Sequence, residues 1–231
     1  MPLRIEGRDP LVRAALSFGG GAEAEGDFVL DTGSTSTLWA SKSFVAAHNL
    51  LATTSRQSVA RFGAGLGGES RVVHARARIV RLGSFRLDAP VVRLSQEKEG
   101  FYATTPHAGT LGGEILRRFR VVLDYQRGRM MLEPGAHFAE PYAGDTSGLD
   151  LVADGRRLST FKIVQVAPDT PGAEAGLRAG DTIESIDGRL AARLSLDLIT
   201  RMFTRAGKAY SLTVTRGRGN FRTTLKTRRL V

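Results

Sequence analysis

Apolar and polar residues alternate through much of the first 133 residues, and this period of two is typical of β-strands with one buried face. Strands are predicted at residues 11–18, 27–31, 72–82, 85–94, 121–124 and 129–132, the last two forming a hairpin. Only short helices interrupt them, one capped by Ser41 and running to about Leu51, the other at 114–119. The first part of the chain is therefore expected to be mostly β.

A change in composition divides the chain. Residues 134–148 are rich in proline, glycine and alanine, which predicts a linker at 135–146 between a domain at 1–134 and a second domain at 147–231. The second domain shows an apolar strand at 161–166, glycine-rich turns, and a helix from Leu196 to about Thr204 with Ser195 as its cap. A basic hairpin follows, so this domain is expected to be α+β.

Charge and composition narrow the possible functions. The 231 residues carry a net charge of +10. The arginines are spread along the chain except in the tail at 216–229, so nucleic-acid binding is only a secondary hypothesis. The absence of cysteine excludes disulfides and thiolate chemistry. The four histidines show no ligand spacing, and neither a metal nor another cofactor is expected. No apolar run is long enough to cross a membrane, and the first ten residues lack the apolar stretch of a signal peptide.

The segment FVLDTGSTSTLW at 28–39 carries the most specific chemical signal. Asp31 follows the apolar run Phe28-Val29-Leu30 and is expected at the end of a buried strand. Gly33 permits a tight turn, and the hydroxyls of Thr32 and Ser34 are expected to hold the carboxylate in place. Three other Asp-Thr pairs in the chain lack both the preceding apolar strand and the following glycine.

A second segment, GTLGGEILRRFRVVLDY at 109–125, resembles the late part of retropepsin-like aspartic peptidases. Leu111-Gly112 matches the family's apolar pair and glycine that cross behind the catalytic loop, although Thr110 stands where an aliphatic residue is usual. The resemblance covers roughly residues 3–133 and implies a single-lobe, retropepsin-like acid protease β-barrel. It places the substrate-covering flap in the glycine-rich stretch at 62–69, with Phe62, Gly63, Gly65 and Gly67.

This resemblance implies an aspartic endopeptidase. Two carboxylates that share a proton around one water are needed, and a single lobe offers one, so the partner is expected to be Asp31 of a second subunit in a homodimer. The catalytic group is then Asp31, Thr32 and Gly33, supported by Ser34, Leu111 and Gly112. Asp124 is the intrachain alternative, which the family pattern makes a structural residue. No Gly-x-Ser-x-Gly or His-Glu-x-x-His motif offers another hydrolytic mechanism.

The segment GAEAGLRAGDTIESIDG at 172–188 resembles the signature of PDZ domains, especially the bacterial kind attached to proteases. Gly176 and Gly180 are expected to make turns, Leu177 to fill the core and Asp181 to cap a turn. The resemblance implies peptide binding as an added strand. The expected peptide-binding residues are Gly148, Leu149, Asp150 and Leu151, in the loop and first strand, and Leu198 and Met202 on the helix. Asp150 replaces a common aliphatic residue, which casts doubt on a preference for terminal carboxylates.

The two resemblances together predict that polypeptide substrates are recruited or gated by the PDZ-like domain. A periplasmic or cell-envelope location is expected from this pairing of domains, with a cytoplasmic location left open. The alternative function is a non-catalytic, peptide-binding adaptor on a degenerate protease lobe. A PDZ-like domain that only packs on the protease is the alternative for the second domain.

Overall fold

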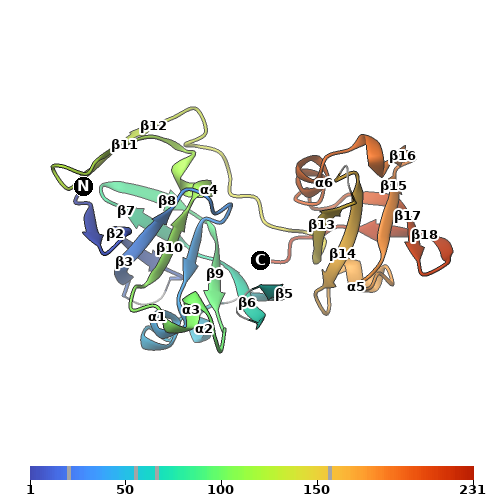
Figure 1. Cartoon of the computed structure of the whole chain (residues 1–231), viewed down its shortest axis with the longest axis horizontal. Coiled ribbons are helices and arrows are strands. Elements are labelled where there is room, and N and C mark those ends of the chain that lie inside the picture. Colours follow the sequence, from blue (N-terminus) through green and yellow to red (C-terminus); the bar gives the residue numbers. More distant parts are fainter. Residues whose placement is uncertain (20–21, 55–56, 66–67, 156–157) are drawn as a thin grey trace. The chain divides into compact units, whose positions relative to one another are not determined.

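The computed structural model describes residues 1–19, 22–54, 57–65, 68–155 and 158–231 (Figure 1). It separates into two compact units, one formed by Met1–Gln57 and Leu66–Tyr142, the other by Ser58–Gly65 and Ala143–Val231. Strands dominate both units, as the hydrophobic alternation predicted for the first. Each unit is described by itself.

One ten-stranded sheet contains most strands of the first unit and also β5, most of whose residues are grouped with the second unit. Its order is β5-β6-β9-β4-β10-β3-β2-β7-β8, with β1 paired to β2. The strands are β1 (Arg4–Glu6), β2 (Asp9–Ser17), β3 (Ala24–Asp31), β4 (Leu38–Ala40), β5 (Gln57–Gly65), β6 (Gly68–Arg76), β7 (Ile79–Leu82), β8 (Phe85–Asp88), β9 (Val91–Ser95) and β10 (Gly109–Gly112).

The strand order corrects one expectation. A barrel closes when its first and last strands pair, whereas this order ends at β5 and β8 among the described residues. The predicted closed β-barrel is therefore not observed, and the first unit is a mostly β unit built on an open sheet. Two long strands predicted at 72–82 and 85–94 are in fact four, because the chain also turns between β6 and β7 and between β8 and β9.

Asp31 lies on β3, an interior strand of the sheet. Phe28, Val29 and Leu30 are all buried, since β3 lies between β2 and β10 with neighbours on both edges. β3 and β10 run parallel, and Gly112 pairs with Asp31. Long-range pairing of this kind is what brings the two motifs of the sequence together.

Short helices complete the first unit: α1 (Lys42–Ala47), α2 (Leu50–Thr53), α3 (Phe101–Thr104) and α4 (Gly113–Leu116). Ser41 caps α1 as predicted, its Oγ accepting from Phe44 N at 3.4 Å. The single helix expected there is split, because Asn49 has a left-handed backbone with φ of 49°. The predicted hairpin is confirmed as β11 (Phe119–Asp124) and β12 (Arg129–Pro134), and Asp124 closes it by accepting from Arg127 N at 3.0 Å.

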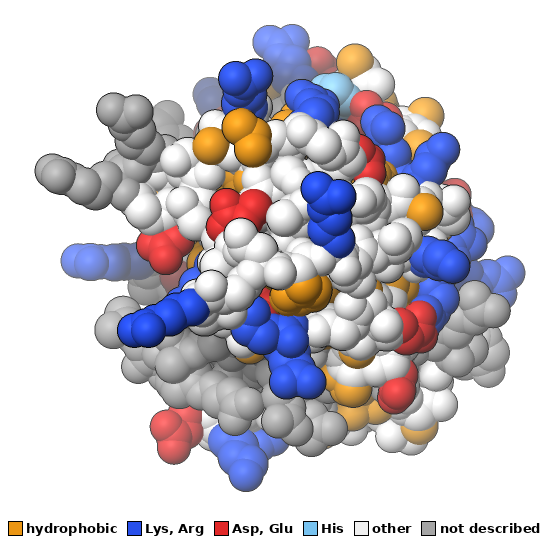
Figure 2. Space-filling view, turned by 90° about the vertical axis from the view of Figure 1, so that its right-hand side faces the viewer, with side chains coloured by type: hydrophobic (Ala, Val, Ile, Leu, Met, Phe, Trp, Pro, Cys, Tyr) orange, Lys and Arg blue, Asp and Glu red, His pale blue; other side chains and the backbone are white. Residues whose placement is uncertain are grey.

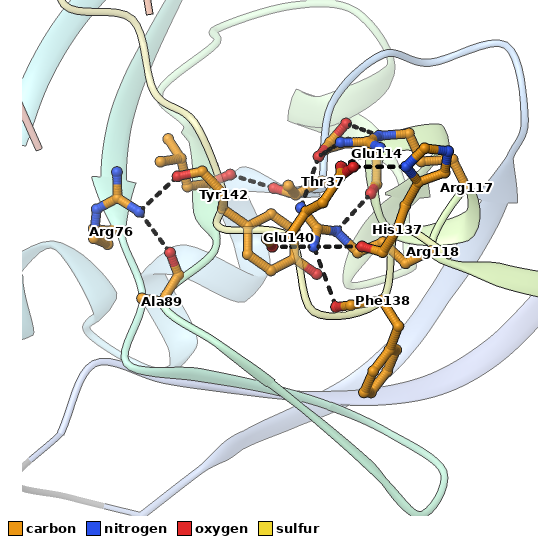
Figure 3. Close-up of polar contacts among 11 residues, drawn as sticks. Thr37, Arg76, Ala89, Glu114, Arg117, Arg118, His137, Phe138, Glu140 and Tyr142 are labelled. Atoms are coloured by element: carbon orange, nitrogen blue, oxygen red, sulfur yellow. Dashed lines mark hydrogen bonds and ion pairs between the residues drawn. The ribbon is translucent and has the colours of Figure 1, made fainter. Parts of the chain in front are cut away.

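A buried arginine fixes the segment after β12 to the first unit. Arg118 is fully buried and donates to the carbonyls of His137, Phe138 and Glu140, while its guanidinium lies 3.5 Å from the ring centroid of Tyr142 (Figure 3). Arg76 adds a bond from Nη1 to the Tyr142 carbonyl at 3.0 Å. Much of the segment predicted as a linker is thus bound to the first unit as far as Tyr142.

The second unit contains a six-stranded sheet and two short α-helices. Its order is β13-β14-β15-β17-β18, with β16 paired to β15. The elements are β13 (Leu149–Asp154), β14 (Thr160–Val166), α5 (Pro171–Glu174), β15 (Thr182–Ile186), β16 (Arg189–Leu190), the 3₁₀ turn η1 (Ala191–Arg193), α6 (Leu196–Met202), β17 (Ala209–Arg216) and β18 (Gly219–Lys226). Phe161, Ile163, Ile183, Leu212 and Leu225 are among the buried residues of its core.

The segment at 172–188, which resembles the PDZ signature, makes its turns at the glycines where they were predicted. Gly176 and Gly180 have φ of +73° and +92°, conformations that L side chains rarely adopt. Asp187 and Gly188 both have positive φ and form the two-residue connection between β15 and β16, as an Asp-Gly pair favours. Leu177 is buried in the core.

Candidate functional site

An open sheet edge is the first element of the candidate site in the second unit. β13 is the terminal strand of its sheet and pairs only with β14 among the described strands. Ile163, the partner of Leu151, donates from N to Asp181 O and accepts at O from Gly180 N, both at 2.8 Å. Because the backbone of Ile163 faces away from β13, the N–H and C=O of Leu151 are directed toward the open edge.

Helix α6 lies beside β13 (Figure 1). Ser195 caps it as predicted, its Oγ accepting from Leu198 N at 3.1 Å. Ile199 and Phe203 are buried, whereas Leu198 and Met202 are partly buried against the same core as Leu149, Leu151 and Ala153. The helix and the edge strand therefore both present apolar side chains that the core leaves partly exposed.

The loop that leads into β13 is tightly built. Gly148 has φ of +75°, and a Cβ at this position would lie 2.0 Å from Thr170 Oγ1. Ala167 N donates to Gly148 O at 2.8 Å, and Gly172 N donates to Ser147 O at 2.7 Å. The structure thus brings the predicted loop, strand and helix residues of the second unit into one region.

In the first unit, Asp31 ends β3 and is partly exposed. Its Oδ1 accepts from Gly33 N at 3.0 Å and from Ser34 N at 3.1 Å. The predicted support by hydroxyls is wrong, because backbone N–H groups hold the carboxylate. Thr32 is exposed, and Ser34 Oγ bonds to Ser36 Oγ at 2.7 Å.

The segment Leu111-Gly112 lies against the Asp31 loop. Leu111 is fully buried and pairs with Leu30. A Cβ at Gly112 would lie 2.3 Å from the carbonyl oxygen of Ser36, so the close approach of the two segments requires glycine. The structure therefore brings together Asp31, Ser34, Leu111 and Gly112, four of the six positions that the two sequence motifs contribute.

The described part of the glycine-rich stretch lies in strands β5 and β6, which are neighbours in the sheet. Phe62, Gly63 and Gly65 lie within β5, whereas Gly67 is outside the described residues. The assignment of this stretch as a flap stays a prediction.

An aromatic stack near Asp31 was missed in the sequence. The rings of Trp39 and Tyr102 stack with centroids 4.1 Å apart, and the Arg93 guanidinium lies 4.9 Å from the Trp39 centroid. Tyr102 Oη is 3.0 Å from Thr110 Oγ1, which explains a hydroxyl where an aliphatic residue was expected. Burial, with a contribution from the charge of Asp31, raises the pKa of Tyr102 despite this bond. No local sequence signal marks a stack that depends on sheet pairing.

Comparison with known proteins identifies the second unit. Residues 162–216 match the sequence model of the PDZ domain, which confirms the predicted PDZ domain. Among curated proteins, none matches this chain.

Three solved structures with likeness to the chain are proteases. A photosystem II D1 C-terminal processing protease is 22% identical over 49% of this chain and 29% of its own, with a TM-score of 0.36. An HtrA-type protease, AlgWS227A with a decapeptide, is 15% identical over 97% of this chain and 60% of its own, with a TM-score of 0.37. A serine endoprotease from Yersinia pestis is 11% identical, covering 95% and 94%, with a TM-score of 0.37.

These findings correct the predicted aspartic endopeptidase activity. The three are named as a C-terminal processing protease, an HtrA-type protease and a serine endoprotease, and none is described as an aspartic peptidase. The likeness also gives this chain no serine mechanism, because the TM-scores are low.

The surface shows no concentration of one charge on the face seen in Figure 2. Lysine and arginine side chains are scattered over it, with acidic side chains among them. Within the described part of the chain, no group of three or more histidine and acidic residues is arranged to hold a metal ion. No described helix is both long and apolar enough to span a membrane.

Proposed function

We propose that this protein binds extended polypeptide segments through its PDZ domain. The observation that carries the proposal is the open edge of β13, in a domain whose class binds peptides by adding a strand to a sheet. Main-chain hydrogen bonds to such an edge give affinity for any extended segment, and side-chain pockets give selectivity.

Gly148, Leu149, Asp150 and Leu151 supply the loop and the edge strand in this proposal. Leu151 directs its backbone groups toward the open edge and so offers a donor and an acceptor to a ligand strand. Leu198 and Met202 supply the apolar wall on α6. A ligand lying between them pairs with β13 on one side and covers these side chains on the other.

The experiment measures binding of dye-labelled β-casein, an unfolded polypeptide, to the full chain by fluorescence anisotropy. Leu198→Glu places a charge on the apolar wall and is expected to weaken binding at least about tenfold, which corresponds to about 1.4 kcal/mol. Thr200→Glu adds the same charge to an exposed position of α6 and is the matched control, expected to bind like the wild type. Equal loss in both variants, or no binding by the wild type, would contradict the proposal.

For the first unit, the proposal extends to the fold alone. A single retropepsin-like lobe is supported by the parallel pairing of β3 with β10 and by the approach of Gly112 to the Asp31 loop. The assignment of the loop residues Asp31, Thr32 and Gly33 as site residues stays a prediction. A homodimer and a periplasmic or cell-envelope location likewise stay predictions.

A further inference from the structure

The loop before β13 has four consecutive backbone donors that are already bonded. Thr146 N donates to Phe203 O at 2.9 Å, and Leu149 N donates to Ser147 Oγ at 3.1 Å. The two amides between them, Ser147 N and Gly148 N, donate to the side chain of Asp145 at 2.9 and 2.7 Å. A ligand that approaches this loop therefore meets no N–H group of residues 146–149 without a bond.

Asp145 occupies the loop as a bound carboxylate would. Its Oδ1 accepts from Ser147 N and, at 2.6 Å, from Ser147 Oγ, while its Oδ2 accepts from Gly148 N. The residue as a whole is exposed, yet both carboxylate oxygens are turned into the loop. Ser147 is fully buried and connects the two ends of the network, since its Oγ donates to Asp145 and accepts from Leu149.

A free C-terminal carboxylate would compete poorly for these donors. Asp145 is part of the same chain, so its effective concentration at the loop is on the order of millimolar or more. A second carboxylate would also have to approach the negative charge of Asp145, and like charges at short distance disfavour each other. Asp150, five residues after Asp145, adds another acidic side chain on β13 itself.

We infer that the PDZ domain of this protein selects internal segments of extended polypeptides, and that Asp145 determines this selectivity by filling the loop before β13 with its own carboxylate. The inference rests on the proposed function and names its ligand class. An internal segment needs only the open edge of β13 and the wall of α6, and it brings no terminal charge to the loop.

The test compares short overlapping peptides of β-casein, each made with a free C-terminal carboxylate and as the C-terminal amide, by anisotropy with the full chain. The two forms are expected to bind with Kd values within about twofold of each other. Tighter binding of the free acid by about tenfold or more would overturn the inference while leaving the proposed function intact. No binding of either form would overturn the proposed function, and the inference with it.

Replacement of Asp145 provides the second arm. Asp145→Ala frees Ser147 N and Gly148 N, so the free-acid peptides are expected to gain at least about tenfold in affinity while the amides change little. Asp145→Asn keeps one oxygen acceptor and is expected to lie between the wild type and Asp145→Ala. Amide hydrogen exchange of β13 and β14 reports whether each variant is folded, and a folded Asp145→Ala protein without any gain for the free acid would contradict the assigned role of Asp145.

Discussion

Arg216 donates two parallel hydrogen bonds to Asp181, from Nε to Oδ1 at 2.7 Å and from Nη2 to Oδ2 at 2.8 Å. The Asp181 side chain is 1% exposed, and it also accepts from Arg178 N at 2.8 Å. Burial alone raises the pKa of Asp181, but the bonds from Arg216 and Arg178 N outweigh it and leave the pKa below its usual value. A carboxylate at the turn before β15 thus ties that turn to the end of β17.

We expect Arg216→Ala to destabilise the PDZ domain, because it leaves the Asp181 carboxylate buried without its cation. Removing one partner of a buried pair costs about 3–5 kcal/mol, and the partial exposure of Arg216 places the effect near the lower end. Hydrogen exchange of β15 in the full chain measures the change. Arg222→Ala removes an exposed arginine of the neighbouring strand β18 and is expected to leave exchange unchanged. Equal effects of the two variants would contradict a specific role for the pair.

Arg118→Met is expected to release the segment at 137–142 from the first unit. The variant keeps a long apolar side chain but removes the donors that hold the carbonyls of His137, Phe138 and Glu140. Hydrogen bonds to charged groups contribute about 1.5–3 kcal/mol each, so proteolytic cleavage within this segment should accelerate at least about tenfold. Arg120→Met is the control, because Arg120 is highly exposed on the neighbouring strand. Unchanged cleavage of Arg118→Met would show that other contacts hold the segment.

Local signals in the sequence were sufficient where the structure is local. Ser41 and Ser195 cap their helices, and Asp187-Gly188 makes its two-residue turn, because each depends on residues a few positions apart. The alternation of apolar and polar residues also predicted most strands of the first unit correctly. The two strands predicted at 72–82 and 85–94 are four in the structure, because the alternation of apolar and polar residues continues across turns that contain no glycine.

Long-range contacts account for what the sequence did not show. Arg118 reads as one basic residue among many, and its burial depends on carbonyls about twenty positions away. Tyr102 meets Trp39 only through the pairing of β4 with β10. Asp145 does carry a local signal, because an aspartate two and three residues before the amides that it binds is an Asx-turn pattern.

Gly148→Ala is expected to destabilise the loop before β13 for two separable reasons. The residue has φ of +75°, and the added Cβ would lie 2.0 Å from Thr170 Oγ1. Gly217→Ala tests the backbone effect alone, because Gly217 has φ of +59° with nothing within 4 Å of its Cβ position. We expect about 1–2 kcal/mol for Gly217→Ala and about 1–3 kcal/mol more for Gly148→Ala, measured by hydrogen exchange of the PDZ domain. Similar costs for both would show that Thr170 moves aside freely.

His74 is expected to make the first unit sensitive to acid. Burial, followed by the charge of Arg93, lowers its pKa from 6.5 to about 3, so the folded protein keeps the imidazole neutral where the unfolded chain binds a proton. Its contribution to stability is complete above pH 6.5 and is lost as pH falls from 6.5 toward 3, at about 1.4 kcal/mol per pH unit. Between pH 7 and pH 5 the free energy of unfolding of the wild type should therefore fall by about 2 kcal/mol through this residue.

The variant His74→Gln cannot titrate at this position, so its free energy of unfolding should fall by about 2 kcal/mol less over the same pH range. Urea unfolding followed by the fluorescence of Trp39, the chain's one tryptophan, measures both at the two pH values. Equal losses in the two proteins would mean that the folded protein protonates His74 as readily as the unfolded chain does.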